Sequence, residues 1–454
     1  MTILYNAILI TGKAETPGSI LIEDEHIAKI WTEQTEADFY ISKHPEAEVV
    51  QLDGKMVLAG GIDAHVHFRD PGLTHKADMQ TESAAALLGG VTSFIDMPNT
   101  TPQTTSEDAL TAKLSSAAGR CHANYGFHLG ATNTNFHTIL KDLDTDPDEI
   151  NEKYAAIKVF MGSSTGNMLV DDPVALNTLF NQTKKVVMVH CEDEAIIKEN
   201  LNAAVEKYGE DIPFRQHPEI RSRKACMKSS MKALELAMQY GTHLHLCHIS
   251  TKEEMEMVRA AKIHNPNITA ETSINYLWFC DEDYERLGSK IKCNPAVKTA
   301  DDRDAIREAL ANGVLDTIGT DHAPHLESEK NKPYRTCPSG IPSIQQTLPV
   351  LLTLHNELDI PMTRIASVFS EKPAEIFGIQ QRGMLKEGNF ADLVVVDEKA
   401  ESIIQKEDLA YKCGWTPYVG EKMTGKVVAV YVNGHLAANE GHVVDACYGK
   451  QLTY

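Results

Sequence analysis

Short runs of apolar residues recur along the middle of the chain, and most are followed by a stretch of helical length. Polar residues and glycines bound the runs, which is typical of strands buried inside a fold. Eight runs lie between residues 58 and 330, at positions 60–67, 91–99, 124–131, 155–162, 184–193, 242–250, 267–274 and 315–324.

Several segments between these runs carry apolar residues at helical spacing, as at 81–90, 229–241 and 251–265. These segments close on Gly or Asn, as helices often do. Alternating strands and helices predict a parallel sheet, and eight such units predict an α/β fold of the (β/α)8 TIM-barrel type. The active site of such a barrel lies at the C-terminal ends of its strands.

Both ends of the chain show a different pattern. Segments 3–10, 18–31 and 48–60 read as short antiparallel strands with turns at Gly, Asp and Asn, and segments 388–397 and 425–436 resume the same style. We therefore expect a small β-sandwich domain built from residues 1–57 and 380–454, attached to a barrel that spans residues 58–379.

Composition narrows the class of protein. The 454 residues are 42% hydrophobic and 24% charged, with a formal net charge of −21 and no basic block, which argues against a nucleic-acid partner. No apolar run approaches the roughly 20 residues that span a bilayer. The nine cysteines are scattered without a C-x-x-C pair, as in reduced cytoplasmic proteins. We expect a cytoplasmic protein that acts on a small molecule.

Polar side chains stand where the predicted strands end. His65, His67 and Arg69 occupy alternate positions after the first run, so their side chains are expected on one face. His243 and His245 share this spacing, but they begin the sixth run and are expected at the opposite end of the barrel. Four imidazoles and a carboxylate gathered at one rim favour a site for Zn²⁺ or a similar divalent metal. The candidate ligands are His65, His67, Lys158, His190, His248 and Asp321.

Lys158 is unusual among these candidates because an ammonium group would be repelled by metal ions. In an apolar strand beside metals the neutral amine is favoured, and it can react with CO₂ to form a carbamate. That anion has two oxygens and can bridge two ions. The competing interpretation is a lysine that reaches solvent or pairs with a carboxylate.

These residues resemble the dihydroorotases of the amidohydrolase superfamily. The resemblance rests on H-x-H-x-R-D-P-G at 65–72, "DMPNT" at 96–100, "TDHAPH" at 320–325, and the segment "GMLKEGNFADLVVVD" near the C-terminus, together with Lys158, His190 and His248. It covers nearly the whole chain. The resemblance implies hydrolysis of a cyclic amide, and in the biosynthetic direction the cyclisation of N-carbamoyl-L-aspartate to L-dihydroorotate plus water in de novo pyrimidine biosynthesis.

The resemblance also implies roles for single residues. His65, His67 and Asp321 would bind one Zn²⁺, His190 and His248 the other, and the Lys158 carbamate would bridge them. Asp321 would carry a proton from the attacking water to the departing amide nitrogen. The substrate-binding candidates are Arg69, Asn99 and His325 for the ring carboxylate and Asn294 for the ring amide.

Three alternatives remain open at this point. Dihydropyrimidinases and allantoinases have a similar metal site but act on substrates that lack the ring carboxylate. A metal-free scaffold homologue would show a damaged ligand set, and a structural zinc module would favour thiolates. A homodimer and a complex with other pyrimidine-pathway enzymes are possible partners, and residues 327–343 form a candidate loop near the site.

Overall fold

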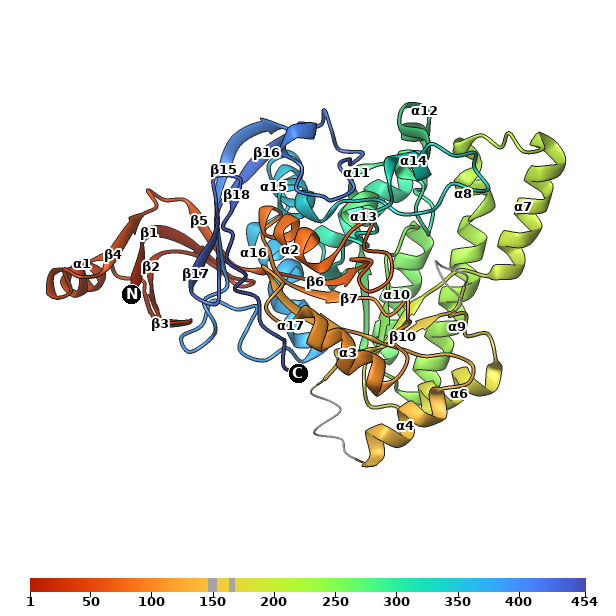
Figure 1. Cartoon of the computed structure of the whole chain (residues 1–454), viewed down its shortest axis with the longest axis horizontal. Helices are drawn as coiled ribbons and strands as arrows, with labels where there is room; N and C mark the ends of the chain where they lie inside the picture. The colour runs from red at the N-terminus through yellow and green to blue at the C-terminus, as the bar shows by residue number, and fades with distance from the viewer. Residues whose placement is uncertain (146–152, 163–167) are drawn as a thin grey trace.

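The computed structural model describes residues 1–145, 153–162 and 168–454. Figure 1 shows a barrel surrounded by helices on the right. To its left lies a sheet in which red strands from the N-terminal part lie next to blue strands from the C-terminal part. The predicted class, a TIM barrel with a second β domain drawn from both ends, is confirmed.

The barrel strands follow the eight predicted runs. Neighbouring strands pair in parallel, and a parallel bridge between Val66 and His322 brings the last strand position next to the first. The strands are β6 (Gly61–Val66), β7 (Val91–Asp96), β8 (Asn124–Phe127), β9 (Leu129–Gly130), β10 (Ile157–Phe160), β11 (Val187–His190), β12 (Leu244–Leu246), β13 (Ile268–Thr272) and β14 (Thr317–Ile318). β8 and β9 are two parts of one strand position, separated by His128.

Helices lie outside the strands (Figure 1). The three helices expected from spacing are present as α2, α9 and α10, where the side chains of Asp78 and Thr251 cap α2 and α10, and Gly241 ends α9 in the left-handed region. The longer helices of this layer are α2 (Met79–Leu88), α3 (Glu107–Ala117), α4 (Phe136–Thr145), α6 (Pro173–Gln182), α7 (Glu194–Tyr208), α9 (Arg223–Tyr240), α10 (Lys252–His264), α13 (Ala300–Ala311) and α15 (Thr347–Leu358). Shorter helices are α8 (His217–Ile220), α11 (Ile274–Trp278), α12 (Tyr284–Leu287), α14 (Glu327–Lys330), α16 (Met362–Ala366) and α17 (Lys372–Phe377).

The two chain ends form one nine-stranded sheet in the order β18-β17-β16-β15-β5-β1-β2-β3, with β4 also paired to β1. Its strands are β1 (Thr2–Ile10), β2 (Glu15–Glu23), β3 (His26–Trp31), β4 (Glu48–Gln51), β5 (Met56–Ala59), β15 (Leu393–Ile403), β16 (Lys422–Val432), β17 (His435–Asn439) and β18 (His442–Val443). The antiparallel expectation is wrong for β4, which runs parallel to β1, and holds on one side only of β5, which is parallel to β1 and antiparallel to β15. Helix α1 (Gln34–Lys43) separates them from the first hairpins, and such a crossover permits parallel pairing.

One face of this sheet packs on the barrel. Val394 and Val430 of the sheet belong to the same buried cluster as Leu348 and Leu352 of α15. At Gly425, φ is 102° and a Cβ would lie 2.5 Å from the Cβ of Leu352, so the close approach of β16 to α15 requires glycine there. In the described ranges, we find no helix with the length and apolar character needed to cross a bilayer.

Candidate active site

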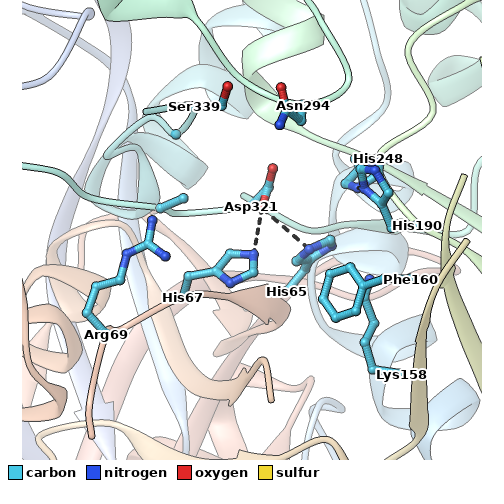
Figure 2. A pocket seen from close by; sticks show the side chains of 12 residues that line it. His65, His67, Arg69, Lys158, Phe160, His190, His248, Asn294, Asp321 and Ser339 are labelled. Atoms are coloured by element: carbon cyan, nitrogen blue, oxygen red, sulfur yellow. Dashed lines mark hydrogen bonds and ion pairs between the residues drawn. The ribbon is translucent and has the colours of Figure 1, made fainter. Parts of the chain in front are cut away.

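A pocket opens at the C-terminal ends of the barrel strands. Figure 2 shows His65, His67 and Asp321 facing one another, with Lys158 below and Arg69 to one side. The residues that line the pocket are His65, His67, Arg69, Lys158, Phe160, His190, His248, Asn294, Asp321, Ala323, Ser339 and Gly340. All six candidate metal ligands are therefore brought together, with Arg69 and Asn294 beside them.

The candidate ligands come from different strands. His65 lies in β6, Lys158 in β10 and His190 at the end of β11. His67, His248 and Asp321 stand shortly after β6, β12 and β14. The loop at 327–343 adds Ser339 and Gly340 to the wall.

The donor atoms are close to one another. Oδ1 of Asp321 is 3.0 Å from Nε2 of His67 and 3.4 Å from Nε2 of His65. On the other side, Nδ1 of His190 is 2.9 Å from Nε2 of His248. One donor atom each of His65, His248 and Asp321 lie within 4.8 Å of one another. A nitrogen- and oxygen-rich set of this kind suits divalent zinc.

The hydrogen bonds behind two of the imidazoles leave their inward nitrogens free. Nδ1 of His65 contacts the carboxylate of Glu271, and Nδ1 of His67 is 2.8 Å from the side-chain oxygen of Asn99. Nε2 of His190 lies 3.1 Å from Glu192 but makes no hydrogen bond to it. Because an acceptor oxygen takes the ring N–H at the outer nitrogens of His65 and His67, the nitrogen of each ring that faces the pocket keeps its lone pair. This is the protonation pattern that metal binding requires, so the residues fit a metal.

The pKa shifts of the candidate ligands agree with neutral imidazoles beside a carboxylate. Burial, the largest cause, lowers the pKa of His190 and lowers those of His65 and His248 well below the ordinary value, which favours the neutral imidazole. Burial alone would raise the pKa of Asp321, but the neighbouring His65 and His67 rings outweigh it and lower that pKa. Asp321 is therefore a carboxylate next to neutral imidazoles.

Lys158 is fully buried beneath these groups. Its Nζ is 2.8 Å from Sγ of Cys247 and 5.1 Å from the centre of the Phe160 ring. Within the described part of the chain, no carboxylate lies at ion-pair distance from Nζ, so the pairing expected under the competing interpretation is not found there. Burial raises the pKa of Cys247, which disfavours a thiolate ligand.

Three residues of the pocket have a left-handed backbone. Their φ angles are 64° for Arg69, 35° for His248 and 49° for Asp321. Such angles are uncommon outside glycine and are often found at functional sites. Arg69 lies beyond the end of β6 at Val66, so its place beside His67 comes from this turn and not from continued strand alternation.

Glu271 was not singled out from the sequence. It is fully buried on β13, contacts Nδ1 of His65, and accepts the backbone N–H of His248 at 3.3 Å. His245 lies deeper in the barrel, 2.8 Å from the Thr269 hydroxyl and outside the pocket lining. A glutamate inside an apolar strand such as 267–274 is the one sequence signal that could have identified this residue.

The four substrate-binding candidates occupy two layers. Arg69 and Asn294 line the pocket, whereas Asn99 and His325 stand behind it in the described structure. Asn99 contacts His67, and Nε2 of His325 is 3.1 Å from a terminal nitrogen of Arg69. Nε of Arg69 donates to the carbonyl oxygen of Pro324 at 3.0 Å. Each of the two outer residues therefore lies against an inner one.

Comparisons with known proteins agree with this geometry. The model of the Amidohydrolase family matches residues 56–437. A dihydroorotase of Methanosarcina acetivorans is 32% identical, covering 89% of this chain and 85% of its own length, and a dihydroorotase of Halobacterium salinarum is 29% identical over 100% of both chains. Among solved structures, an L-hydantoinase (dihydropyrimidinase) from Arthrobacter aurescens superposes with a TM-score of 0.91 at 26% identity, covering 100% of this chain and 99% of its own.

Proposed function

Because this chain belongs to the amidohydrolase family and is a cyclic amide hydrolase, we propose that its reaction is that of a dihydroorotase. The enzyme would interconvert N-carbamoyl-L-aspartate and L-dihydroorotate plus water, as a step of de novo pyrimidine biosynthesis. Relatives named dihydroorotase, at about 30% identity over most of the chain, support this choice.

The main support for the proposal is that the buried guanidinium of Arg69 has no anionic partner in the described structure. Its side chain is buried and lines the pocket, yet its polar contacts among the described residues are the carbonyl oxygen of Pro324 at 3.0 Å and Nε2 of His325 at 3.1 Å, and neither is an anion. A guanidinium has five N–H donors, and a buried cation without an anion is costly. A ligand carboxylate in the pocket would accept the remaining donors in bidentate geometry. Dihydroorotate carries such a carboxylate.

We propose two Zn²⁺ ions as the cofactors. His65, His67 and Asp321 would hold one ion, His190 and His248 the other, and Lys158, as a CO₂-derived carbamate, would bridge them. Bound zinc supplies a water of lowered pKa and polarises the amide carbonyl. The neutral inward nitrogens of the imidazoles support this assignment.

Side chains of the pocket would transfer the proton and bind the ring amide. Asp321 is the catalytic residue of the proposal, because its carboxylate faces the centre of the pocket and can take a proton and return it to the amide nitrogen. Its Oδ1, held 3.0 Å from Nε2 of His67, is oriented for that transfer. Asn294, on the opposite wall, would bind the ring amide. By microscopic reversibility the same groups serve ring closure.

A hydantoinase or dihydropyrimidinase activity is the second candidate, and the L-hydantoinase (dihydropyrimidinase) from Arthrobacter aurescens favours it. That comparison reaches 26% identity, and the superposition reflects a fold shared across the family. The buried, incompletely paired Arg69 favours a substrate with a carboxylate. The complete set of six candidate ligands in the pocket argues against a metal-free scaffold.

We further propose that the enzyme works in the cytoplasm, as a homodimer or in a complex with other pyrimidine-pathway enzymes. All nine cysteines are free thiols in the structure, which supports a reducing compartment. The partners proposed for the site itself are N-carbamoyl-L-aspartate and L-dihydroorotate.

A substrate panel tests the reaction. Zinc-loaded protein is assayed for ring opening of L-dihydroorotate, dihydrouracil, hydantoin and allantoin at matched concentrations. We expect kcat/KM for dihydroorotate to exceed the others by at least about a hundredfold, the scale set by leaving a buried charge unpaired. Activity with hydantoin or allantoin and none with dihydroorotate would replace the proposal with the second candidate.

A further inference from the structure

Lys76 is a buried lysine behind the pocket that belongs neither to the candidate metal ligands nor to the pocket lining. It lies in the segment between β6 and α2. Its Nζ is 3.1 Å from Nδ1 of His325 and 2.9 Å from a carboxylate oxygen of Glu329. A second cation, Arg69, approaches the other ring nitrogen of the same histidine. His325 is thus an imidazole held between two positive groups.

This position forces a neutral ring. Burial lowers the pKa of His325 far below its ordinary value, and the charges of Arg69, Lys76 and Lys330 act in the same direction. A neutral imidazole has one N–H and one lone pair, so only one of its two tautomers can fit the surroundings.

Lys76 at Nδ1 and the Ser339 oxygen at Nε2 select the same tautomer. Of the contacts of the ring with Lys76, Ser339 and Arg69, this tautomer satisfies two, whereas the opposite tautomer would satisfy only the contact of Nε2 with Arg69. An ammonium group can only donate, so Nδ1 must accept from Lys76 and cannot carry the proton. At the other end, Nε2 is 3.1 Å from the backbone oxygen of Ser339, which can only accept. The proton therefore belongs on Nε2.

The tautomer of His325 determines which donors of Arg69 stay free. With its proton on Nε2, His325 cannot accept from the Arg69 nitrogen that lies 3.1 Å away, so the guanidinium keeps its donors for a ligand. The imidazole N–H is directed to the backbone oxygen of Ser339. The free edge of the guanidinium fits a carboxylate, which accepts through both oxygens.

We propose that Lys76 is a specificity-determining positioning residue that fixes the Nε2–H tautomer of His325, so that Arg69 keeps its donors for the substrate carboxylate. This inference rests on the proposed dihydroorotase function for its substrate and on the contacts of Lys76 for its mechanism. The alternative role of Lys76 is purely structural. It would pair with Glu329, whose other oxygen accepts the backbone N–H of Leu326 at 3.0 Å, and so hold the loop.

Kinetics separate the two roles. In the zinc-loaded full chain, Lys76→Met should lower kcat/KM for L-dihydroorotate about tenfold to a hundredfold through KM, the size expected for a hydrogen bond to a charged group. The substitution should leave the slow ring opening of dihydrouracil, which lacks the carboxylate, within about twofold. Lys76→Arg, which can still donate to Nδ1, should restore most of the loss.

A surface lysine provides the matched control. Lys290 lies 3.8 Å from Glu327 in the same region and its side chain is 40% exposed, so Lys290→Met should change neither substrate. An equal loss on both substrates in Lys76→Met, or no loss on either, would overturn the proposal.

Nitrogen NMR of isotope-labelled histidines tests the tautomer without any turnover. The His325 signals are assigned by their disappearance in His325→Asn, and the wild-type spectrum should show a protonated Nε2 and an unprotonated Nδ1. Lys76→Met should shift the ring towards a mixture. A protonated Nδ1 in the wild type would refute the role of Lys76 even if dihydroorotate is turned over. The expected spectrum in a protein that does not turn over dihydroorotate would instead refute the proposed function alone.

Discussion

The side-chain oxygen of Asn99 lies 2.8 Å from Nδ1 of His67, on the far side of the ring from Asp321. The sequence led us to expect Asn99 at the substrate carboxylate. That role stays a prediction; in the structure its oxygen accepts the outer N–H of a candidate metal ligand, which fixes the ring and turns Nε2 toward the pocket. Asn99 is therefore placed to support metal binding.

We predict that Asn99→Ala lowers zinc affinity about tenfold or more, the range found when a ligand's hydrogen-bond partner is removed. The affinity is measured by chelator competition on the purified variant and wild type. Unchanged affinity together with a raised KM for dihydroorotate would return Asn99 to the substrate carboxylate.

Glu271 should matter for both halves of the metal site because it contacts the ring of His65 and the backbone of His248. We predict that Glu271→Ala lowers zinc affinity by about 10- to 100-fold. Glu271→Gln, whose side-chain oxygen can still accept a hydrogen bond, should lose less. The zinc released at a fixed chelator concentration is the measurement, and equal retention by all three proteins would disprove the supporting role.

Arg69 should determine substrate choice. Removing one partner of a buried charged pair costs about 2–5 kcal/mol, so Arg69→Met should lower kcat/KM for dihydroorotate by about 30-fold to several thousandfold. Dihydrouracil, which has no carboxylate, should be affected much less. Steady-state kinetics on both substrates provide the comparison, and parallel losses would show that Arg69 acts on the metal site instead.

Lys330 anchors the loop that carries the pocket wall. Its buried Nζ donates to the backbone oxygens of Lys292, Pro338 and Gly340 at 3.0–3.1 Å. Lys330→Met would leave three buried carbonyl groups without this donor. Since an unsatisfied buried acceptor costs about 1–3 kcal/mol, the free energy of unfolding in urea should fall by at least about 2 kcal/mol.

The exposed neighbour Lys332 offers the control for this prediction. Lys332→Met should change the free energy of unfolding by less than about 0.5 kcal/mol, as surface substitutions usually do. Similar unfolding curves for both variants would mean that Lys330 does not stabilise the loop.

The sequence predicted the barrel well because its strands are short apolar runs buried on both faces, as at 184–193 and 267–274. It also identified six residues that the fold brings to one pocket, since strand ends meet at one rim. The direction in which neighbouring strands of the terminal sheet pair could not be predicted from the sequence. β4 and β5 carry the same local pattern whether they pair in parallel or antiparallel.

The residues behind the pocket could not be found from spacing. Glu192, Glu271 and Lys76 reach His190, His65 and His325 through contacts that depend on how strands and loops are placed in space. The turn at Arg69 was likewise not visible, because a left-handed φ at a non-glycine residue leaves no mark in a single sequence.

The most direct test is the rate of L-dihydroorotate ring opening, followed by loss of its amide absorbance, with zinc counted in the same preparation. We expect turnover together with about two zinc ions per chain. A protein with its full zinc content and no turnover of dihydroorotate would contradict the proposed dihydroorotase function, whatever its activity towards hydantoins.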